Sequence, residues 1–238
     1  MIEVVAKARL IAFPLGCQWI ILGDSLAASP PDVRKVSDLP IATELILGLR
    51  PTFEMNKFQI SRDSQALYIT MVAKDRLPVF QTDAIKKVTC EALNEARGSG
   101  GFLIFAYVIM PDHLHVITTQ PNTSAEVLRY VKGITGRRVI DYLKEKNFKS
   151  SLAKLRHEEW KRKHTHSLWQ QEKNVFSVFS EAAFMQRVNY IHLNPVRAGL
   201  VERAIDYRWS SARIWQRCPM EDEPLMVDID RIEWRRGA

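Results

Sequence analysis

The sequence predicts an α+β fold in which an antiparallel sheet of the split βαβ (ferredoxin-like) type carries helices on one face. Three observations support this prediction. Apolar or β-branched runs and longer amphipathic segments follow one another in the order β-α-β-β-α-β between residues 66 and 180, a Pro-Asp turn joins the two middle strands, and a further amphipathic segment follows. The 238 residues, 46% hydrophobic and 26% charged, are sufficient for one sizeable core.

The first four elements each have a local reason. Residues 66–75 are rich in apolar and β-branched side chains, which favour a strand. The helix after it starts at a Thr-Asp cap, runs to about Arg97 and is expected to stop at the glycine-rich stretch 98–101. The apolar runs at 102–110 and 113–120 are predicted to form a hairpin through the Pro-Asp pair between them.

The remaining elements follow a second helix start. Thr123 is followed three residues later by a glutamate, which is a capping box for a helix that runs to about Lys146. After a basic connector, residues 169–180 are expected to hold a short strand. The last helix, 181–194, is expected to end at Pro195 because proline disrupts a helix interior.

Three parts of the chain are distinguished. Residues 58–215 hold the predicted sheet and its last helix, residues 1–57 form an N-terminal extension of unknown role, and residues 216–238 form a C-terminal tail. The extension contains LIAFPLGCQWIILG after two basic residues, which resembles a secretory signal. Proline and glutamine interrupt this run and it is too short to span a bilayer, so we expect a buried segment or a start site assigned too early.

The number and spacing of the cysteines argue against a disulfide-stabilised fold and against a zinc site. Cys17, Cys90 and Cys218 are far apart, odd in number and without CxxC spacing. This pattern argues against a disulfide framework and against a thiolate zinc site, and it fits a reducing compartment.

The positive charge of the chain is concentrated in one segment. Between Thr123 and Lys173 there are 13 Lys and Arg against 6 Asp and Glu, a net +7 that equals the net charge of the whole chain. Such a basic block is typical of a protein that binds phosphate backbones. The alternative is a solvated helix face on a protein that is simply basic.

Two histidines alternate with a leucine at the start of the predicted strand 113–120. In a strand, residues i and i+2 point to the same face, so His113 and His115 project side by side, as two ligands of one divalent cation do. The alternative is two polar residues in an ordinary strand. A second HxH, at His164 and His166, follows three basic residues that would repel a cation, and we interpret it as part of the basic block.

A second pattern is RVNYIHLNPVRAGLV. On a helix Tyr190 and Asn194 are four residues apart and share a face, so a hydroxyl and an amide oxygen can point at one centre. Because Asn194 precedes a proline, it can also turn away. The alternative is a core tyrosine followed by an Asn-Pro helix stop. His192 faces away from Tyr190 by about 200° on an ideal helix.

These motifs together resemble a known family. YVIMPDHLHVI, followed in order by LWQ, YIHLNPVRAGLV and RWSS, is similar to the IS200-like transposase superfamily, specifically the REP-associated tyrosine transposases of bacteria. Trp169 precedes Tyr190 by 21 residues, as expected of that family. The resemblance covers about residues 58–215. The stretch QQEKNVFSVFS lacks the aromatic and acidic or histidine cluster often seen after the tryptophan, so the resemblance assigns no DNA contacts there.

The resemblance implies a single-strand nuclease of the HUH type that acts on hairpin-forming DNA such as repetitive extragenic palindromes. His113 and His115 would bind Mg²⁺ or Mn²⁺, Asn194 would complete the metal site, and Tyr190 would attack a DNA phosphodiester. The product would be a 5′-phosphotyrosine link with a free 3′-hydroxyl. The protein would act in the cytoplasm, away from membranes, as a monomer or a homodimer.

DNA contacts are expected from the basic block. The residues expected to bind backbone phosphates are Arg129, Lys132, Arg137, Arg138, Arg156, Lys161, Arg162 and Lys163. Trp160 and Trp169 flank the end of the connector and are candidates to stack unpaired bases. A core role for one of the two is the favoured alternative, and Trp169 is the one assigned to DNA binding.

Some assignments stay open. Two histidines suit Mn²⁺ better than Mg²⁺, so we expect a loosely held ion with waters and substrate oxygens in its shell. Asp112 either orients the imidazole of His113 or caps the turn, and we expect the cap. The alternatives to a strand transferase are a hairpin-binding regulatory protein that has lost cleavage and a metal-dependent phosphodiesterase that uses water.

Overall fold

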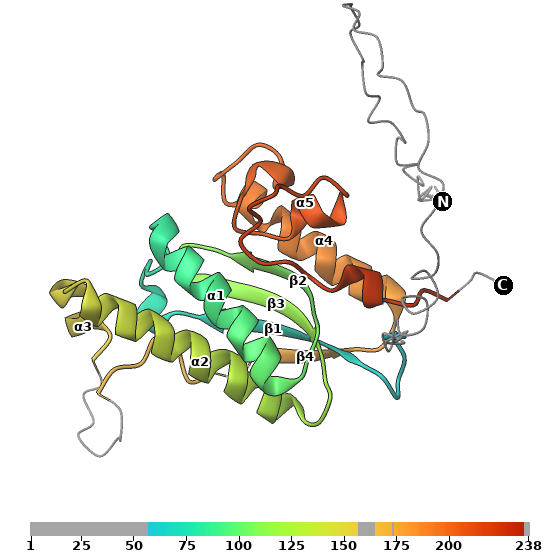
Figure 1. Ribbon diagram of the computed structural model, residues 1–238, viewed down its shortest axis with the longest axis horizontal. Helices are drawn as coiled ribbons and strands as arrows, with labels where there is room; N and C mark the ends of the chain where they lie inside the picture. The colour runs from blue at the N-terminus through green and yellow to red at the C-terminus, as the bar shows by residue number, and fades with distance from the viewer. Residues whose placement is uncertain (1–56, 157–164, 173, 236–238) are drawn as a thin grey trace, which may run out of the picture. The chain divides into compact units, whose positions relative to one another are not determined.

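The computed structural model describes residues 57–156, 165–172 and 174–235. Their elements, shown in Figure 1, are β1 (Ala66–Val72), the 3₁₀ turn η1 (Lys74–Arg76), α1 (Asp83–Gly100), β2 (Ile104–Ile109), β3 (His113–Thr119), α2 (Ser124–Glu145), α3 (Lys149–Lys154), β4 (Asn174–Val178), α4 (Glu181–Arg197), η2 (Ala204–Asp206), α5 (Ala212–Trp215) and η3 (Ile229–Arg231). No helix of these residues is long and apolar enough to cross a membrane.

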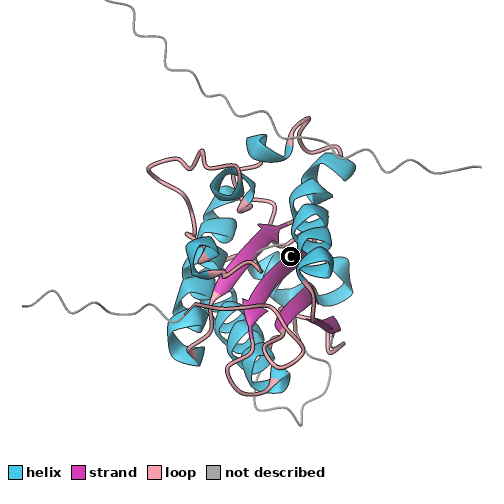
Figure 2. Cartoon of the chain, turned by 90° about the vertical axis from the view of Figure 1, so that its right-hand side faces the viewer, coloured by secondary structure: helices cyan, strands magenta, loops and turns pink. Residues whose placement is uncertain are grey.

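The four strands form an antiparallel sheet in the order β2-β3-β1-β4. β1 lies inside the sheet between β3 and β4, and β3 separates β1 from β2, which is the predicted split βαβ topology. The predicted α+β fold class is therefore confirmed. Helices α1 and α2 pack against each other on one face of the sheet (Figure 1), and Figure 2 shows that helices flank both sides, with α4 on the face opposite to α1 and α2.

The first helix runs further than expected. α1 continues through Gly98 and Gly100 and ends only at Gly101, which has the left-handed φ of 63°. A glycine inside a helix lowers its stability by only about 1 kcal/mol, which tertiary packing can offset. The left-handed Gly101 ends the helix, and Gly100 is needed for close packing, because a Cβ there would lie 2.6 Å from the buried ring of Phe102.

The predicted stop at Pro195 is wrong, because α4 continues to Arg197. The N–H of Leu200 donates to the carbonyl of Pro195 (2.9 Å) and the N–H of Gly199 to that of Val196 (3.0 Å). Gly199 has a φ of 68°. This is a Schellman motif, in which a left-handed glycine satisfies the last carbonyls of a helix, and the proline is accommodated one turn before it.

The segment expected to be a C-terminal tail packs into the same core. Four apolar side chains of this segment are buried, namely Leu225, Val227, Ile229 and Ile232. The carboxylate of Asp228 accepts the backbone N–H of Ile104 at 2.9 Å and pairs with Arg97 at 3.2 Å. The core therefore extends well beyond the expected end of the domain at residue 215.

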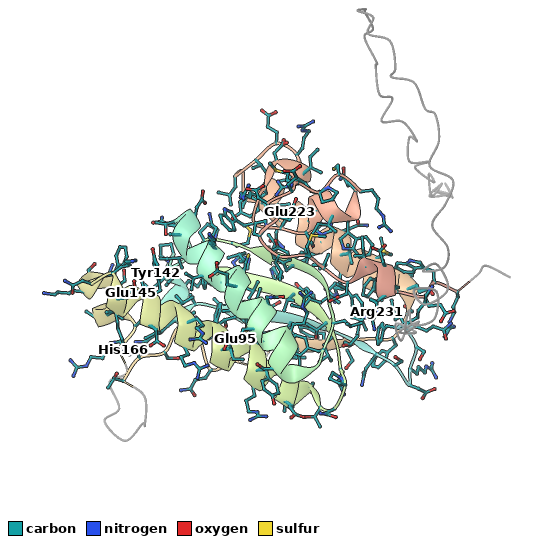
Figure 3. All side chains as sticks on the ribbon, viewed as in Figure 1. Glu95, Tyr142, Glu145, His166, Glu223 and Arg231 are labelled. Atoms are coloured by element: carbon teal, nitrogen blue, oxygen red, sulfur yellow. The ribbon has the colours of Figure 1, made fainter. Side chains whose placement is uncertain are left out.

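A buried ion pair between this segment and α5 gives the first testable prediction. The side chain of Glu223, labelled in Figure 3, is only 1% exposed, and its carboxylate accepts a hydrogen bond from the guanidinium of Arg213 at 2.6 Å. Replacing it by glutamine leaves a mostly buried guanidinium without a counter-charge. Glu223→Gln is therefore expected to lower the free energy of unfolding by about 3 kcal/mol in urea denaturation. Exposed Glu221 is the matched control, and equal midpoints for Glu223→Gln and Glu221→Gln would contradict this role.

Candidate active site

β3 places two histidine rings side by side on the sheet face that carries α4. In the register of β1 and β3, Val72 faces His113 and Thr70 faces His115. The two imidazole rings have centroids 4.9 Å apart and an interplanar angle of 78°. The alternation of a β-strand is therefore enough to bring both imidazoles to one place.

The ring of His115 is buried and held by two hydroxyl groups of β1. Its Nδ1 lies 2.9 Å from the hydroxyl oxygen of Tyr68 and 2.9 Å from that of Thr70. A proton on Nδ1 donates to either oxygen and leaves the lone pair of Nε2 for a cation. Desolvation, with a smaller effect of His113, lowers the pKa of His115 to about 3, so the imidazole is neutral at physiological pH, as a metal ligand must be.

The ring of His113 is oriented by its neighbour Asp112. His113 Nδ1 lies 2.6 Å from one carboxylate oxygen of Asp112, and Arg76 donates to the other at 3.1 Å. Partial burial would raise the pKa of Asp112, but the hydrogen bonds and charges of His113 and Arg76 lower it overall. The expected turn cap is wrong, because both carboxylate oxygens contact side chains. The carboxylate instead engages Nδ1 and leaves Nε2 for a ligand bond.

Tyr190 projects from α4 onto this histidine pair. Its ring lies 5.6 Å from the ring of His115, centroid to centroid, at an interplanar angle of 78°, and 6.4 Å from the ring of Tyr68. Tyr190 is nevertheless 38% exposed. Tyr190 is thus packed against the imidazole of His115 on one side and exposed on the other.

The residues present fit a weakly held divalent cation. Asn194 stays helical within α4, and its Nδ2 donates to the carbonyl of Tyr190 at 3.3 Å, so its Oδ1 is the atom left to act as a ligand. Among the described residues, no three His, Cys, Asp or Glu side chains cluster in a way that could hold a metal. The two imidazoles are the ligands that the structure brings together, and they leave positions for water and phosphate oxygens, as Mn²⁺ and Mg²⁺ accept.

Two arginines at the site were missed in the sequence. The guanidinium of Arg187 lies 5.0 Å from the ring centre of Tyr68, and that of Arg197 lies 5.2 Å from the ring centre of Tyr190. Within the described part of the chain, neither forms an ion pair with a carboxylate. The sequence contains a pattern that could have revealed them. One helix face, with the spacing i, i+3, i+7, i+10, carries Arg187, Tyr190, Asn194 and Arg197.

Comparison with known proteins identifies the family. The family model described as "Transposase IS200 like" matches residues 62–194, which is more than half of the chain. The chain belongs to the IS200-like transposase family. Transposases are enzymes that process DNA, so the site described above lies in a DNA-processing protein.

Two solved structures of transposases are similar to this chain. The transposase is similar to a REP-associated tyrosine transposase bound to a REP hairpin, with 19% identity, a TM-score of 0.44, and coverage of 69% of this chain and 87% of the other. It is also similar to a putative transposase from Deinococcus radiodurans R1, with 21% identity, a TM-score of 0.38, and coverage of 54% and 88%. No curated protein matches it.

The predicted DNA-binding residues of α2 do not lie at this site. α2 covers the sheet face opposite to α4 (Figure 2). Arg138 binds Glu95 of α1 at 2.7 and 2.9 Å, and Arg137 lies 3.6 Å from the same carboxylate, which is labelled in Figure 3. Arg129 pairs with a glutamate of its own helix at 3.4 Å, and Lys132 donates to two main-chain carbonyls before β4. The structure therefore does not bring these charges to the histidine pair.

The rest of the predicted basic block is only partly described. Arg156 follows α3, and its backbone bridges to that of His166. The other predicted residues of the connector, Trp160, Lys161, Arg162, Lys163 and His164, lie outside the described residues. The N-terminal extension also lies outside them.

Trp169 is a core residue of the transposase. Its ring is buried and stacks on Phe80 at 5.3 Å, and its Nε1 donates to the hydroxyl of Thr135 at 3.0 Å. One face of the ring and its polar edge are thus engaged inside the core. The expectation that Trp169 stacks an unpaired base is contradicted by this burial, and the core alternative holds.

The RWSS motif fixes the helix that carries Tyr190. His192 is buried, and its Nε2 lies 2.9 Å from the hydroxyl of Ser211, which accepts the N–H of Tyr107 in β2 at 3.0 Å. The prediction that His192 faces away from the exposed Tyr190 is confirmed. The motif thus links α4 to the sheet through one histidine.

This link gives a pH-dependence prediction. Desolvation lowers the pKa of His192 from 6.5 to about 4, so between these values the unfolded chain takes up a proton that the folded protein does not. The folded state therefore loses up to about 1.4 kcal/mol per pH unit from this group as the pH falls below 6.5. In urea denaturation, the stability difference between wild type and His192→Gln should shrink from pH 7 to pH 4.5, whereas a constant difference would rule out this titration.

Proposed function

We propose that this transposase nicks and rejoins single-stranded DNA with Tyr190 as its nucleophile. The observation that carries the proposal is the packing of the exposed Tyr190 ring against His115, 5.6 Å away, next to a second oriented imidazole. A tyrosine beside two imidazoles that are both held through Nδ1 is the arrangement that phosphotyrosine chemistry needs.

Each step uses a group of this chain. The phenol oxygen of Tyr190 attacks the phosphorus of a DNA phosphodiester, a new O–P bond forms, and the bond from phosphorus to the 3′-oxygen breaks. The phenol proton leaves to solvent, and the departing 3′-oxygen takes up a proton and becomes a hydroxyl. The reverse reaction, with an incoming 3′-hydroxyl, releases Tyr190 and rejoins strands, so no energy source is required.

Nε2 of His113, Nε2 of His115 and Oδ1 of Asn194 would hold Mg²⁺ or Mn²⁺. When bound, the cation polarises the phosphoryl group and offsets the charge that develops on it. Asp112 keeps its imidazole partner oriented, and the hydroxyls of Tyr68 and Thr70 do the same for the second imidazole.

Arg187 and Arg197 are proposed to bind the phosphates on either side of the cleaved bond, because both flank Tyr190 on α4 without a carboxylate partner among the described residues. The basic residues of α2 and the connector are proposed to contact more distant DNA, such as a hairpin stem that extends around the domain. The preference for hairpin DNA and the cytoplasmic location follow from the sequence resemblance.

A cleavage assay tests the proposal. End-labelled stem-loop oligonucleotides with unpaired flanks are incubated with the full chain in Mn²⁺, Mg²⁺ or EDTA and separated under denaturing conditions. We expect a protein-linked band that depends on the metal and on unpaired flanks. Hairpin binding in EDTA without any adduct would instead indicate the regulatory protein, and cleavage without an adduct would indicate a phosphodiesterase that uses water.

A further inference from the structure

An exposed aromatic side chain on β4 adjoins the candidate active site. Phe176 pairs with Tyr68 in the sheet, so its side chain lies on the same face as Tyr68 and His115. It is 53% exposed, and its ring lies 6.3 Å from that of Tyr68, centroid to centroid. β4 is the edge strand of the sheet, so a large apolar ring stands at the rim of the site.

Arg187 lies over this ring. Its guanidinium lies 6.0 Å from the ring centre of Phe176 and 5.0 Å from that of Tyr68, so one cation spans both rings. Arg187 is also one helical turn before Tyr190 on α4. The rings of Phe176, Tyr68 and Tyr190 form a continuous row, with centroids 6.3 and 6.4 Å apart, that leads from the sheet edge to the candidate nucleophile.

We propose that Phe176 and Arg187 form a platform on which an unpaired base next to the scissile phosphate stacks. The exposed ring offers a π-face to the base, and the guanidinium, which has no carboxylate partner among the described residues, offers its donors to the adjoining phosphate. This inference rests on the proposed function, because it assigns a substrate group to the site around Tyr190.

The platform accounts for selection of single-stranded DNA. A base within a duplex is already stacked and paired, and it would have to be extracted before it could lie on Phe176. An unpaired base meets no such barrier. Because every base has a π-face, the platform discriminates between paired and unpaired DNA rather than between sequences.

Phe179 provides a matched control. It is 50% exposed and lies three residues after Phe176. In the part of the chain that the structure describes, its ring has no aromatic or cation partner. Replacement of either residue by leucine keeps an apolar side chain and removes a π-face, so any difference between the two variants reports the position of the ring.

The experiment measures binding separately from cleavage. A fluorescein-labelled stem-loop with unpaired thymine flanks is titrated with the full chain in EDTA, and fluorescence anisotropy gives the affinity. Phe176→Leu is expected to weaken binding roughly 10-fold, as loss of one base–aromatic stack does, and to leave binding of a fully paired duplex unchanged. Phe179→Leu should stay within about twofold of wild type, and thermal melting shows that both variants fold.

Photo-crosslinking locates the base. With 5-iodouracil in place of each flank thymine in turn, we expect one position next to the cleavage site to crosslink to Phe176 and to lose this crosslink in Phe176→Leu. Equal affinities of the two leucine variants, with no crosslink to Phe176, would overturn the platform even if the wild type forms a covalent adduct. A Phe176 crosslink together with the affinity loss, in a protein that forms no adduct with any DNA, would support the platform and refute the proposed cleavage.

Discussion

Tyr190→Phe is expected to abolish covalent attachment to DNA and to lower the cleavage rate on the order of 10⁴-fold or more, because it removes the nucleophile itself. The ring is kept, so its packing against His115 is preserved. DNA affinity in EDTA should therefore remain within about twofold of wild type, which separates a chemical defect from a binding defect. A denaturing gel with end-labelled stem-loop DNA measures adduct and cleavage together.

Tyr142→Phe is the matched control for this prediction. Tyr142, labelled in Figure 3, lies on α2, which covers the opposite face of the sheet. The Tyr142→Phe variant loses one hydroxyl, as Tyr190→Phe does, and it should cleave DNA at the rate of wild type. A rate like that of wild type in Tyr190→Phe would contradict the proposed nucleophile.

His113→Ala and His115→Asn are expected to remove the response to divalent metal and to lower the cleavage rate roughly 100-fold or more, because each deletes one of two imidazole ligands. The affinity for Mn²⁺ is measured by titrating the protein–DNA complex with Mn²⁺ and recording the decrease in the paramagnetic signal of the free ion. His115 is buried, so asparagine is chosen to keep a polar side chain against Tyr68 and Thr70.

The second HxH pair of the chain supplies the control for the metal prediction. His164→Ala combined with His166→Ala removes two histidines with the same spacing from the connector sequence after three basic residues. This double variant should retain Mn²⁺ affinity and cleavage. If it lost both while His113→Ala retained them, the metal assignment would be wrong.

Local patterns predicted the sheet and the histidine pair because a strand has a period of two. The alternation in HLHVITTQ fixed that His113 and His115 share a face, whatever packs against that face. Helical periodicity likewise predicts Tyr190 and Asn194 on one side of α4 and His192 on the other. Periodicity thus determines which residues lie together within one element.

The features that the sequence did not predict depend on which helices and strands pack against each other. Charge along the chain does not report a sheet face, so the basic residues of α2 were associated with a site that lies on the other side of the sheet. Trp169 was placed on the surface because its partners, Phe80 and Thr135, are distant in sequence. The local rule predicts a helix stop at Pro195, but the helix continues to Arg197 because a Schellman motif one turn later satisfies its last carbonyls.

The site of covalent attachment tests the central claim most directly. The wild-type protein is trapped with stem-loop DNA in Mn²⁺, digested with nuclease and trypsin, and analysed by tandem mass spectrometry. We expect a nucleotide joined through its 5′-phosphate to Tyr190, within the tryptic peptide 188–197. A nucleotide on any other residue, or cleavage of the DNA without a modified peptide, would contradict it.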